Sequence, residues 1–511
     1  MRIPLFWLFF CLLVLLACGL TDWINQPPMG VHQWRQADGA SLMWFYYQGN
    51  SFFQPEIFNL ETDGYGYAIG ELPFTYWIAG KIACLFGWNV AILRWVHLLI
   101  FLSGTGSLVW ILRQLLKPKQ AHLFSALLVS ILASTPVFTY YCASYLPDSP
   151  ALSLVFLSWS LLFYGYRSDR KRWIYGAAVI AALSACLKLT MALSWAATVV
   201  ALLLFPGKYP TISAAIRRHF LLSTSIWGLM IVGCRWWIMQ YNAQYDSSYF
   251  LASVRPVWLY SATEIYEILM GLKYEMKGIL SLGTAIGLAG VVYFFLKNRR
   301  KIHVGILLFI VLHIAGAVAV IVLFFRMYRE HDYYTFALWP VPVLIALTMA
   351  SYLRQQKRII VLSVFLLLVN VLWTNRVLHL RAEDATAHPF TQSVLYGAED
   401  RDWLSKSGIS PAAHLFCPED PSPNTLLFAL NRQGWTAYNF GLQPDSTALE
   451  SYRSLGLEYL VLTDTQHYTG IYPALFPMKI MEEEGIVIYQ SGNSPIPPNL
   501  FRENSESVVS P

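Results

Sequence analysis

Long apolar runs are the feature that most limits what this 511-residue chain can fold into. The segments 3–20, 303–325 and 359–373 are almost unbroken runs of apolar residues. About 20 such residues are what a helix needs to cross roughly 30 Å of bilayer hydrocarbon. Only 13% of the residues are charged, against about 25% in an ordinary soluble domain, which excludes a soluble enzyme. We therefore expect an α-helical polytopic membrane protein.

The apolar pattern predicts about eleven membrane spans before residue 380. They are expected near 4–20, 90–112, 121–139, 150–166, 173–188, 190–205, 220–240, 279–296, 303–325, 334–352 and 359–376. Five alternate connections are basic, which marks the cytoplasmic side of a membrane. Their cations are Arg113, Lys117, Lys119, Arg167, Arg170, Lys171, Arg172, Lys208, Arg217, Arg218, Lys297, Arg299, Arg300, Lys301, Arg354, Lys357 and Arg358. The loops 21–89 and 241–278 and the chain after 381 then face outward from the inner (cytoplasmic) membrane.

The first helix has an alternative interpretation. Arg2, the apolar run after it and Leu15-Leu16-Ala17-Cys18 are similar to a lipoprotein signal, which is cleaved from the mature protein. We prefer an uncleaved helix, because the long loop that follows needs an anchor at both ends.

Charge divides the chain near residue 380. The first 380 residues hold 29 Lys or Arg against 14 Asp or Glu, whereas the rest hold 7 against 16. The basic clusters lie between apolar segments rather than on one face, so nucleic-acid binding is not indicated. The runs HLFCPED, LEYLVLTD and GIVIYQ are typical of strands, and NTLLFALNRQG and ALESYRSLG of helices. We expect a transmembrane domain over 1–380, a small extracytoplasmic α/β domain over 381–490 and a flexible tail over 491–511.

The first outward loop contains the most informative polar residues. In VHQWRQADGA, Arg35 and Asp38 are three residues apart, so both can lie on one face of a helix that begins near Gln36. Residues 40–47 continue an amphipathic pattern, which favours a helix on the membrane surface. A glycine-rich turn then leads to Glu71 at the membrane boundary.

Further ionisable residues recur at the same expected membrane level. Asp148 lies in YLPDSP at the outer end of one span, and FFRMYREHDYY carries Arg326, Arg329, His331 and Asp332 at the outer end of another. Ionisable residues at this depth are costly and often functional. The alternatives stay open: Asp148 can simply cap a helix starting at Pro150. Similarly, Asp420-Pro421-Ser422-Pro423-Asn424 can contact an acceptor or form a turn capped by Asn424.

The order of these motifs is similar to that of a known family. HQWRQAD, a long first loop, ELP, a PDxP at the end of the third span and HDYY before a proline-rich span resemble GT-C superfamily membrane glycosyltransferases. The nearest resemblance is to bacterial family 39-like enzymes, which are related to protein O-mannosyltransferases and to the lipid A aminoarabinose transferase. It covers roughly residues 1–380. It implies transfer of a sugar, with inversion, from a polyprenyl phosphate to a lipid, glycan or protein acceptor outside the cytoplasmic membrane.

The resemblance also implies roles for individual residues. Asp38 matches the catalytic base, and Glu71 a second acid that positions metal or substrate. The phosphate and the substrates are expected to contact Arg35, Asp148, Lys273, Lys277, Arg326, Arg329, His331 and Tyr333. The family usually pairs two adjacent acids in the first loop, but here Ala37 and Gly39 flank Asp38. Leu72 also replaces the basic residue that follows the second acid, so this sequence departs from the family at the local phosphate clamp.

Three alternatives remain at this point. A divalent metal is possible, with Asp38, Glu71, Asp148 and His331 as ligands, although no spacing resembles HExxH. A transporter or flippase of lipid-linked or soluble substrates predicts inverted repeats and charges at the bilayer midplane, which the sequence does not show. A non-catalytic protein that binds lipid-linked sugars would not require Asp38.

Overall fold

The computed structural model describes residues 5–61, 64–116, 121–208, 213–247, 254–350, 352, 356–440 and 445–492. Lys117, Lys119, Arg354 and the expected tail from 493 onward lie outside these residues. The chain forms two compact units. The helical unit comprises 1–26, 69–241 and 250–382, and the α/β unit comprises 27–68, 242–249 and 383–511. Residues 27–68 thus group with the C-terminal part, whereas the sequence had suggested that the first loop belongs with the spans.

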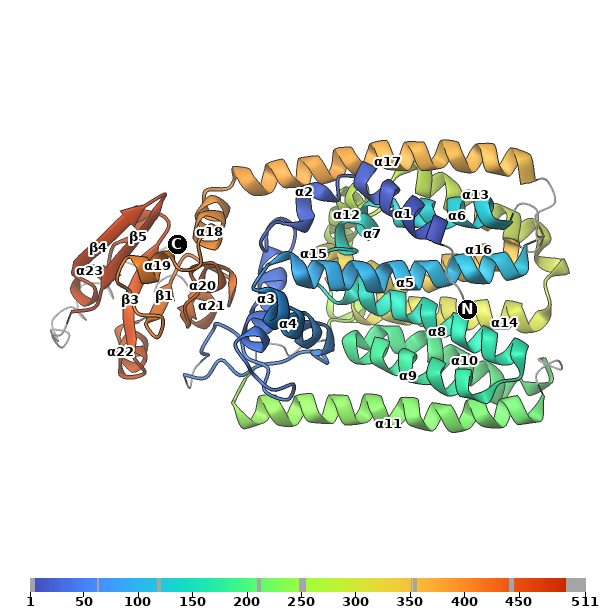
Figure 1. Ribbon diagram of the computed structural model, residues 1–511, viewed down its shortest axis with the longest axis horizontal. Coiled ribbons are helices and arrows are strands. Elements are labelled where there is room, and N and C mark those ends of the chain that lie inside the picture. The colour runs from blue at the N-terminus through green and yellow to red at the C-terminus, as the bar shows by residue number, and fades with distance from the viewer. Residues whose placement is uncertain are drawn as a thin grey trace. The chain divides into compact units, whose positions relative to one another are not determined.

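The helical unit follows the predicted apolar segments. Its helices are α1 (Leu5–Ala17), α2 (Thr21–Ile24), α4 (Phe74–Phe86), α5 (Ala91–Leu115), α6 (Ala121–Ala133), α7 (Pro136–Tyr141), α8 (Asp148–Ser168), α9 (Lys171–Leu187), α10 (Ala192–Leu204), α11 (Ala214–Gln244), α12 (Ala262–Ile279), α13 (Leu282–Asn298), α14 (Val304–Leu323), α15 (Met327–Glu330), α16 (Pro340–Ala350) and α17 (Gln356–Ala387). Short 3₁₀ turns are η1 (Leu189–Met191), η2 (Pro206–Lys208), η3 (Val257–Leu259), η4 (Arg299–Lys301) and η5 (Asp332–Leu338). The long helices α5, α11 and α17 run in a common direction (Figure 1), as a membrane bundle requires.

Each of the eleven expected spans coincides with a helix or with two consecutive helices. Among the described residues, five helices are long and apolar enough to cross a membrane, or up to seven if each of two bent pairs is one span. Four shorter helices are also apolar, including α4 after Glu71. The protein is therefore a polytopic α-helical membrane protein.

Small residues allow α5, α8 and α9 to pack closely. A Cβ atom on Gly104 of α5 would lie only 2.4 Å from the carbonyl oxygen of Ser153 on α8. Ser184 of α9 donates a hydrogen bond to the carbonyl oxygen of Ala151 at 2.6 Å. Membrane helices, which gain little from the hydrophobic effect, commonly associate through such close backbone contacts and hydroxyl bonds.

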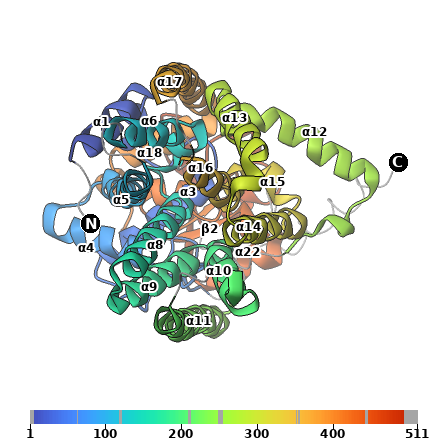
Figure 2. The same cartoon turned by 90° about the vertical axis from the view of Figure 1, so that its right-hand side faces the viewer.

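Part of the region expected to be the loop 241–278 is a helix. Helix α12 begins with a capping box in which Ser261 and Glu264 satisfy each other's backbone N–H groups. It is bent by 102° from the segment 282–301 that follows it. Figure 2 shows α12 leaving the side of the bundle that is viewed end-on. The capping box, SATE, was the local signal for this helix.

The α/β unit is built around one mixed sheet. Its strands are β1 (His414–Cys417), β2 (Gly434–Thr436), β3 (Leu457–Leu462), β4 (Met478–Glu483) and β5 (Ile486–Gln490), in the order β2-β1-β3-β5-β4. β1 runs parallel to β2 and β3, and β5 runs antiparallel to β3 and β4. Its helices are α3 (Gln33–Tyr47), α18 (Pro389–Glu399), α19 (Trp403–Lys406), α20 (Thr425–Leu430), α21 (Ala437–Phe440), α22 (Ser446–Ser454) and α23 (Tyr472–Leu475), with η6 (Thr465–His467).

The first loop completes one edge of this sheet. Asn59 forms a parallel bridge with Gly434 of β2, where Leu60 donates to the Gly434 carbonyl at 2.9 Å. Leu60 also belongs to the same buried apolar cluster as Phe416 and Trp435. The loop segment therefore protects an edge that would otherwise expose unpaired backbone groups.

Candidate functional site

Helix α3 positions Asp38 in the α/β unit. The predicted helix begins at Gln33, three residues earlier than expected, and places Arg35 and Asp38 one turn apart. Arg35 Nη1 donates to Asp38 Oδ2 at 3.3 Å. The Asp38 side chain has no exposure, while that of Arg35 is 19% exposed. The two side chains therefore share one face of the helix, as expected, and form an ion pair around a buried carboxylate.

Asn424 is a second partner of Asp38 that the sequence did not reveal. Its Nδ2 donates to Asp38 Oδ1 at 2.8 Å. Its Oδ1 accepts bonds from the backbone N–H groups of Phe58 and Asn59, both at 3.0 Å. Asn424 occupies the residue before α20 but makes no side-chain cap there, so the capping interpretation is wrong. It instead orients the Asp38 carboxylate.

Asp420 and Ser422 cap α20 in place of Asn424. Asp420 Oδ2 accepts from the N–H of Leu426 at 2.7 Å, and Ser422 Oγ accepts from the N–H of Thr425 at 3.0 Å. Asp420 is completely buried, and loss of hydration raises its pKa to about 6. The negative charge of Asp38 is a smaller contribution to this raised pKa, so the two acids influence each other within one unit.

Glu71 lies in a separate polar environment in the helical unit. It is buried and accepts a hydrogen bond from the Tyr76 hydroxyl at 2.7 Å. The Tyr76 ring contacts the ring of His97, which binds the Ser144 carbonyl through Nδ1 at 2.7 Å. These contacts hold Glu71 in place from α4, the helix that follows the ELP motif.

Asp148 is held by a lysine that lies 40 residues later in the sequence. Lys188 Nζ is 2.9 Å from Asp148 Oδ1, and the Asp148 side chain is 2% exposed. Helix α8 begins at Asp148 itself, with Pro147 before it and no side-chain cap. The proposal that Asp148 caps a helix beginning at Pro150 is therefore wrong, and the residue takes part in a largely buried ion pair.

Lys188 also joins Asp148 to the HDYY motif. Its ammonium nitrogen lies 4.8 Å from the ring centre of Tyr333 and 4.5 Å from that of Tyr334. His331 stacks on Tyr333 with ring centres 5.2 Å apart. Asp148 from one motif and His331 and Tyr333 from another therefore meet around a cation that was not predicted. Lys188 is 21% exposed, so a ligand can reach it.

Asp332 pairs with a second cation of the helical unit, Arg381. Arg381 Nη2 donates to Asp332 Oδ2 at 3.0 Å, and the Tyr141 hydroxyl donates to Oδ1. The Arg381 guanidinium also covers the ring of Tyr140 at 5.0 Å. Asp332 is therefore neutralised and satisfied by contacts from α7 and α17.

The other expected phosphate ligands lie on the surface of the helical unit. Arg326 is 46% exposed and pairs with Glu330 one turn away, at 2.5 Å. Arg329 is exposed and lies against Gly271 of α12. Lys273 and Lys277 are exposed on α12. Among the described contacts, none of these four cations joins the group around Lys188.

The described residues do not bring together a metal-binding group. No three His, Cys, Asp or Glu side chains gather in the described part of the chain to hold an ion. Asp148, one of the expected ligands, is in contact with an ammonium group instead. A metal shell of Asp38, Glu71, Asp148 and His331 gains no support from these contacts.

This chain is similar to known proteins in part of its sequence and in its fold. The model of the family named dolichyl-phosphate-mannose-protein mannosyltransferase matches residues 71–237. A search among curated protein sequences finds no significant match. ArnT from Cupriavidus metallidurans in the apo state aligns over 96% of this chain and 99% of its own, with a TM-score of 0.65 and 13% identity.

Two further solved structures have a similar fold. ArnT from the same organism bound to undecaprenyl phosphate aligns over 96% of this chain and 98% of its own, with a TM-score of 0.64 and 13% identity. The oligosaccharyltransferase of Archaeoglobus fulgidus, in complex with Zn and sulfate, aligns over 91% of this chain and 69% of its own. The TM-score is 0.50 and the identity is 12%. The fold predicted from the motif order, that of GT-C membrane glycosyltransferases, is confirmed.

Proposed function

We propose that this protein is an inverting glycosyltransferase that moves a sugar from a polyprenyl phosphate to an extracytoplasmic lipid, glycan or protein acceptor. The observation that carries the proposal is the family match over 71–237, because this segment contains Glu71, Asp148 and Lys188. The structural likeness extends this support over nearly the whole chain and includes an ArnT bound to undecaprenyl phosphate.

The donor half of the reaction needs positive charge near the departing phosphate. Lys188 meets this need, because its ammonium group is partly exposed and rests on Tyr333 and Tyr334. Asp148 holds Lys188 in position. Arg326, Arg329, Lys273 and Lys277 are weaker candidates, since they are exposed to screening by water and salt. A phosphate is already a good leaving group, so no general acid is required.

The acceptor half needs a base. In a single displacement, the acceptor oxygen attacks C1 of the sugar, the C1–O bond to phosphate breaks, and the acceptor proton passes to the base. We assign this role to Asp38, with Arg35 favouring its ionised form and Asn424 fixing Oδ1. Oδ2, whose contact with Arg35 is 3.3 Å long, is the atom that would take the proton. Because Asp38 is buried, Arg35 must move aside when the acceptor binds. Glu71 is the rival base.

The test is a transfer reaction with the purified protein in lipid. Lipid extracts of cells that lack the protein should accumulate a glycosylated polyprenyl phosphate, and its mass identifies the donor. Added to the purified protein with membrane extract as acceptor source, this donor should be converted to free polyprenyl phosphate. Donor that crosses the bilayer unchanged would indicate a flippase. Donor that binds without conversion would indicate a non-catalytic binding protein.

The expected orientation has its own test. Single cysteines at Gln54, Glu267 and Thr447, all exposed, should react with an impermeant thiol reagent on intact cells. A cysteine at the exposed Arg300 is the matched control and should react only after the cells are opened. The native thiol of Cys84 is exposed and is first replaced by serine. Protection of position 447 with labelling of position 54 would contradict an outward C-terminal domain.

A further inference from the structure

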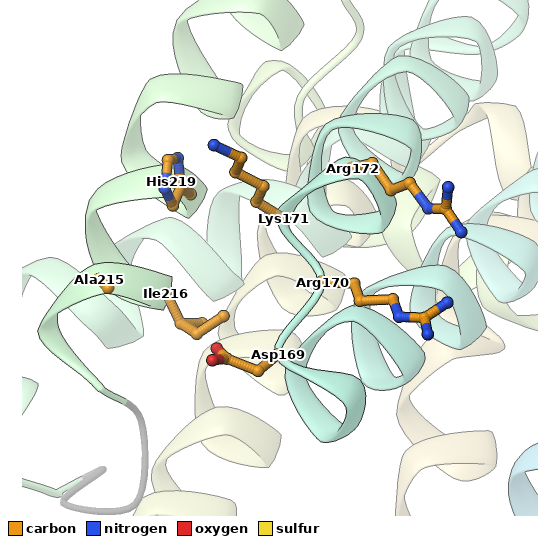
Figure 3. Close-up of a pocket in the computed structure, with 7 residues that line it drawn as sticks. All are labelled: Asp169, Arg170, Lys171, Arg172, Ala215, Ile216 and His219. Atoms are coloured by element: carbon orange, nitrogen blue, oxygen red, sulfur yellow. The ribbon is translucent and has the colours of Figure 1, made fainter.

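A pocket with a strongly basic wall lies at the end of the helical unit that carries the basic connections. Its volume is about 610 Å³, and it lies between the turn joining α8 to α9 and the first turns of α11. The lining side chains are those of Asp169, Arg170, Lys171, Arg172, Ala215, Ile216 and His219 (Figure 3). None of them belongs to the groups around Asp38, Glu71 or Lys188.

Two basic groups face one another across this pocket. Figure 3 shows Lys171 of α9 pointing toward His219 of α11, whereas Arg170 and Arg172 point away from His219. His219 Nδ1 is fixed by the Tyr175 hydroxyl at 3.1 Å, which holds the imidazole ring against α9. The site therefore offers an exposed ammonium group opposite a ring held in place.

Two cations lie at the N-terminus of α9, which is the positive end of the helix dipole. Lys171 and Arg172 occupy the first turn of α9, where the helix dipole already favours negative charge, and this turn contains no acid. No side chain caps the N-terminus of α9. In the described part of the chain, no carboxylate lies within 4.0 Å of the nitrogens of Arg170, Lys171 or Arg172. Asp169 is the one acid in the lining.

We infer that this pocket binds a phosphate group, supplied either by the headgroup of an anionic membrane lipid or by free inorganic phosphate. A phosphate would offset the excess positive charge and accept hydrogen bonds from Lys171 and from the first-turn N–H groups of α9. The positive-inside rule explains why cations lie at this membrane face. It does not explain why an uncapped helix start and two basic groups from different helices line one pocket. The inference is independent of the proposed transfer reaction.

The experiment uses the full chain in nanodiscs of phosphatidylcholine with a minority of phosphatidylglycerol. Native mass spectrometry counts the phosphatidylglycerol molecules that stay bound when the disc is removed. The variant Lys171→Gln with His219→Gln should bind phosphatidylglycerol at least about fivefold more weakly, the scale for one basic residue at a charged membrane surface. The matched control is Arg299→Gln with Arg300→Gln, which removes two exposed cations of η4 outside the pocket. It should lose less phosphatidylglycerol binding than the pocket variant, because it removes surface charge without changing the pocket.

A second arm separates the two sources of phosphate. Inorganic phosphate at millimolar concentration that displaces phosphatidylglycerol from the parent, but not from the double variant, indicates a soluble ligand. Retention of phosphatidylglycerol in its presence indicates the lipid. The double variant should melt at the parental temperature in pure phosphatidylcholine, and Lys171→Glu alone provides a second test if it does not. Equal phosphatidylglycerol retention and equal phosphate response in the parent and in these pocket variants would overturn the inference.

Discussion

Both units of this protein bury a carboxylate beside a cation, but they do so in different ways. In the helical unit, Asp148 pairs with Lys188 at 2.9 Å and Asp332 pairs with Arg381 at 3.0 Å, each partner coming from a distant part of the sequence. In the α/β unit, Asp38 pairs with a residue of its own helix at 3.3 Å and gains a neutral amide donor from Asn424.

The difference concerns how closely each acid is paired with its cation. A charge buried in a membrane bundle is costly unless it is closely paired, so the pairs of Asp148 and Asp332 act mainly in positioning. The contact of Asp38 with its cation, Arg35, is longer, and a neutral amide donor supplements it, which favours Asp38 as the base. The predictions below test this contrast, starting with the largest effect.

Replacing Asp38 with Asn should nearly abolish transfer. The amide keeps the shape of the side chain but cannot take a proton, so turnover should fall at least about 100-fold, the usual scale for losing a general base. Donor binding should persist, because Lys188 lies in the helical unit and keeps its charge. Initial rates of conversion of the glycosylated polyprenyl phosphate measure this effect.

Glu71→Gln is the matched control for Asp38→Asn, since both remove a buried carboxylate. The Gln variant keeps an acceptor for the Tyr76 hydroxyl, so it should change turnover much less. An active Asp38→Asn protein together with an inactive Glu71→Gln protein would transfer the role of base to Glu71.

Replacing Lys188 with Met should reduce both donor turnover and stability. The loss of a charge-assisted contact to phosphate is worth about 2 kcal/mol, or roughly 30-fold in rate. The same change leaves Asp148 buried without its ammonium partner, which should lower the melting temperature. Adding Asp148→Asn should recover most of the stability but not the rate, and this split separates phosphate binding from a purely structural role.

Arg326→Ala is the control for Lys188→Met. Its pair with Glu330 is half exposed, and exposed pairs contribute at most about 1 kcal/mol. We expect near-parental turnover and melting temperature. A strong loss of turnover in Arg326→Ala, with a parental rate in Lys188→Met, would indicate that the phosphate binds at the surface of the unit.

These contrasts also show what the sequence could predict. The spans, the helix bearing Arg35 and Asp38, and three of five strands follow from local patterns, namely apolar runs, i,i+3 spacing and strand-like alternation. Lys188, Arg381 and Asn424 could not be identified, because each becomes a partner only when distant segments meet. A lysine between two apolar helices, at the break between α9 and η1, was the available signal for Lys188.

The strands β2 and β4 escaped prediction for a related reason. β2 has only three residues, Gly434–Thr436, and depends on β1 and on the bridge to Asn59 for its pairing. β4 is mostly exposed and carries charged residues, so its alternation is weak. Both are stabilised by their neighbours in the sheet rather than by a local preference.

Replacing Asn424 with Ala should have a moderate effect on transfer. The change removes the donor to Asp38 Oδ1 but leaves Arg35 in place, so a loss of up to about tenfold is expected. Because the ionised carboxylate loses a hydrogen bond, the acidic limb of the pH–rate profile should move to higher pH. Asn431→Ala, in the same unit but bonded to Arg401, is the control and should leave the profile unchanged. A rate loss without a shift of the profile would indicate a merely structural role.

Asp420 should affect transfer least, and the expected result is instead a pH-dependent change in stability. Burial raises its pKa from 3.8 in the unfolded chain to about 6 in the folded one. The folded protein therefore binds this proton more tightly, and its contribution to stability falls as the pH rises from about 4 to about 6. A shift of about two pKa units corresponds to at most about 3 kcal/mol, since one unit is about 1.4 kcal/mol.

The variant Asp420→Asn isolates this contribution, because an amide does not titrate. The measurement is thermal unfolding of the purified protein at about pH 4, 5 and 7. The stability of the parent relative to the variant should fall as the pH rises across this range. Asp445→Asn, which replaces an exposed cap of α22 in the same unit, should keep the parental pH dependence even if it melts earlier. If the pH dependence of Asp420→Asn equals that of the parent, burial does not raise the pKa of Asp420.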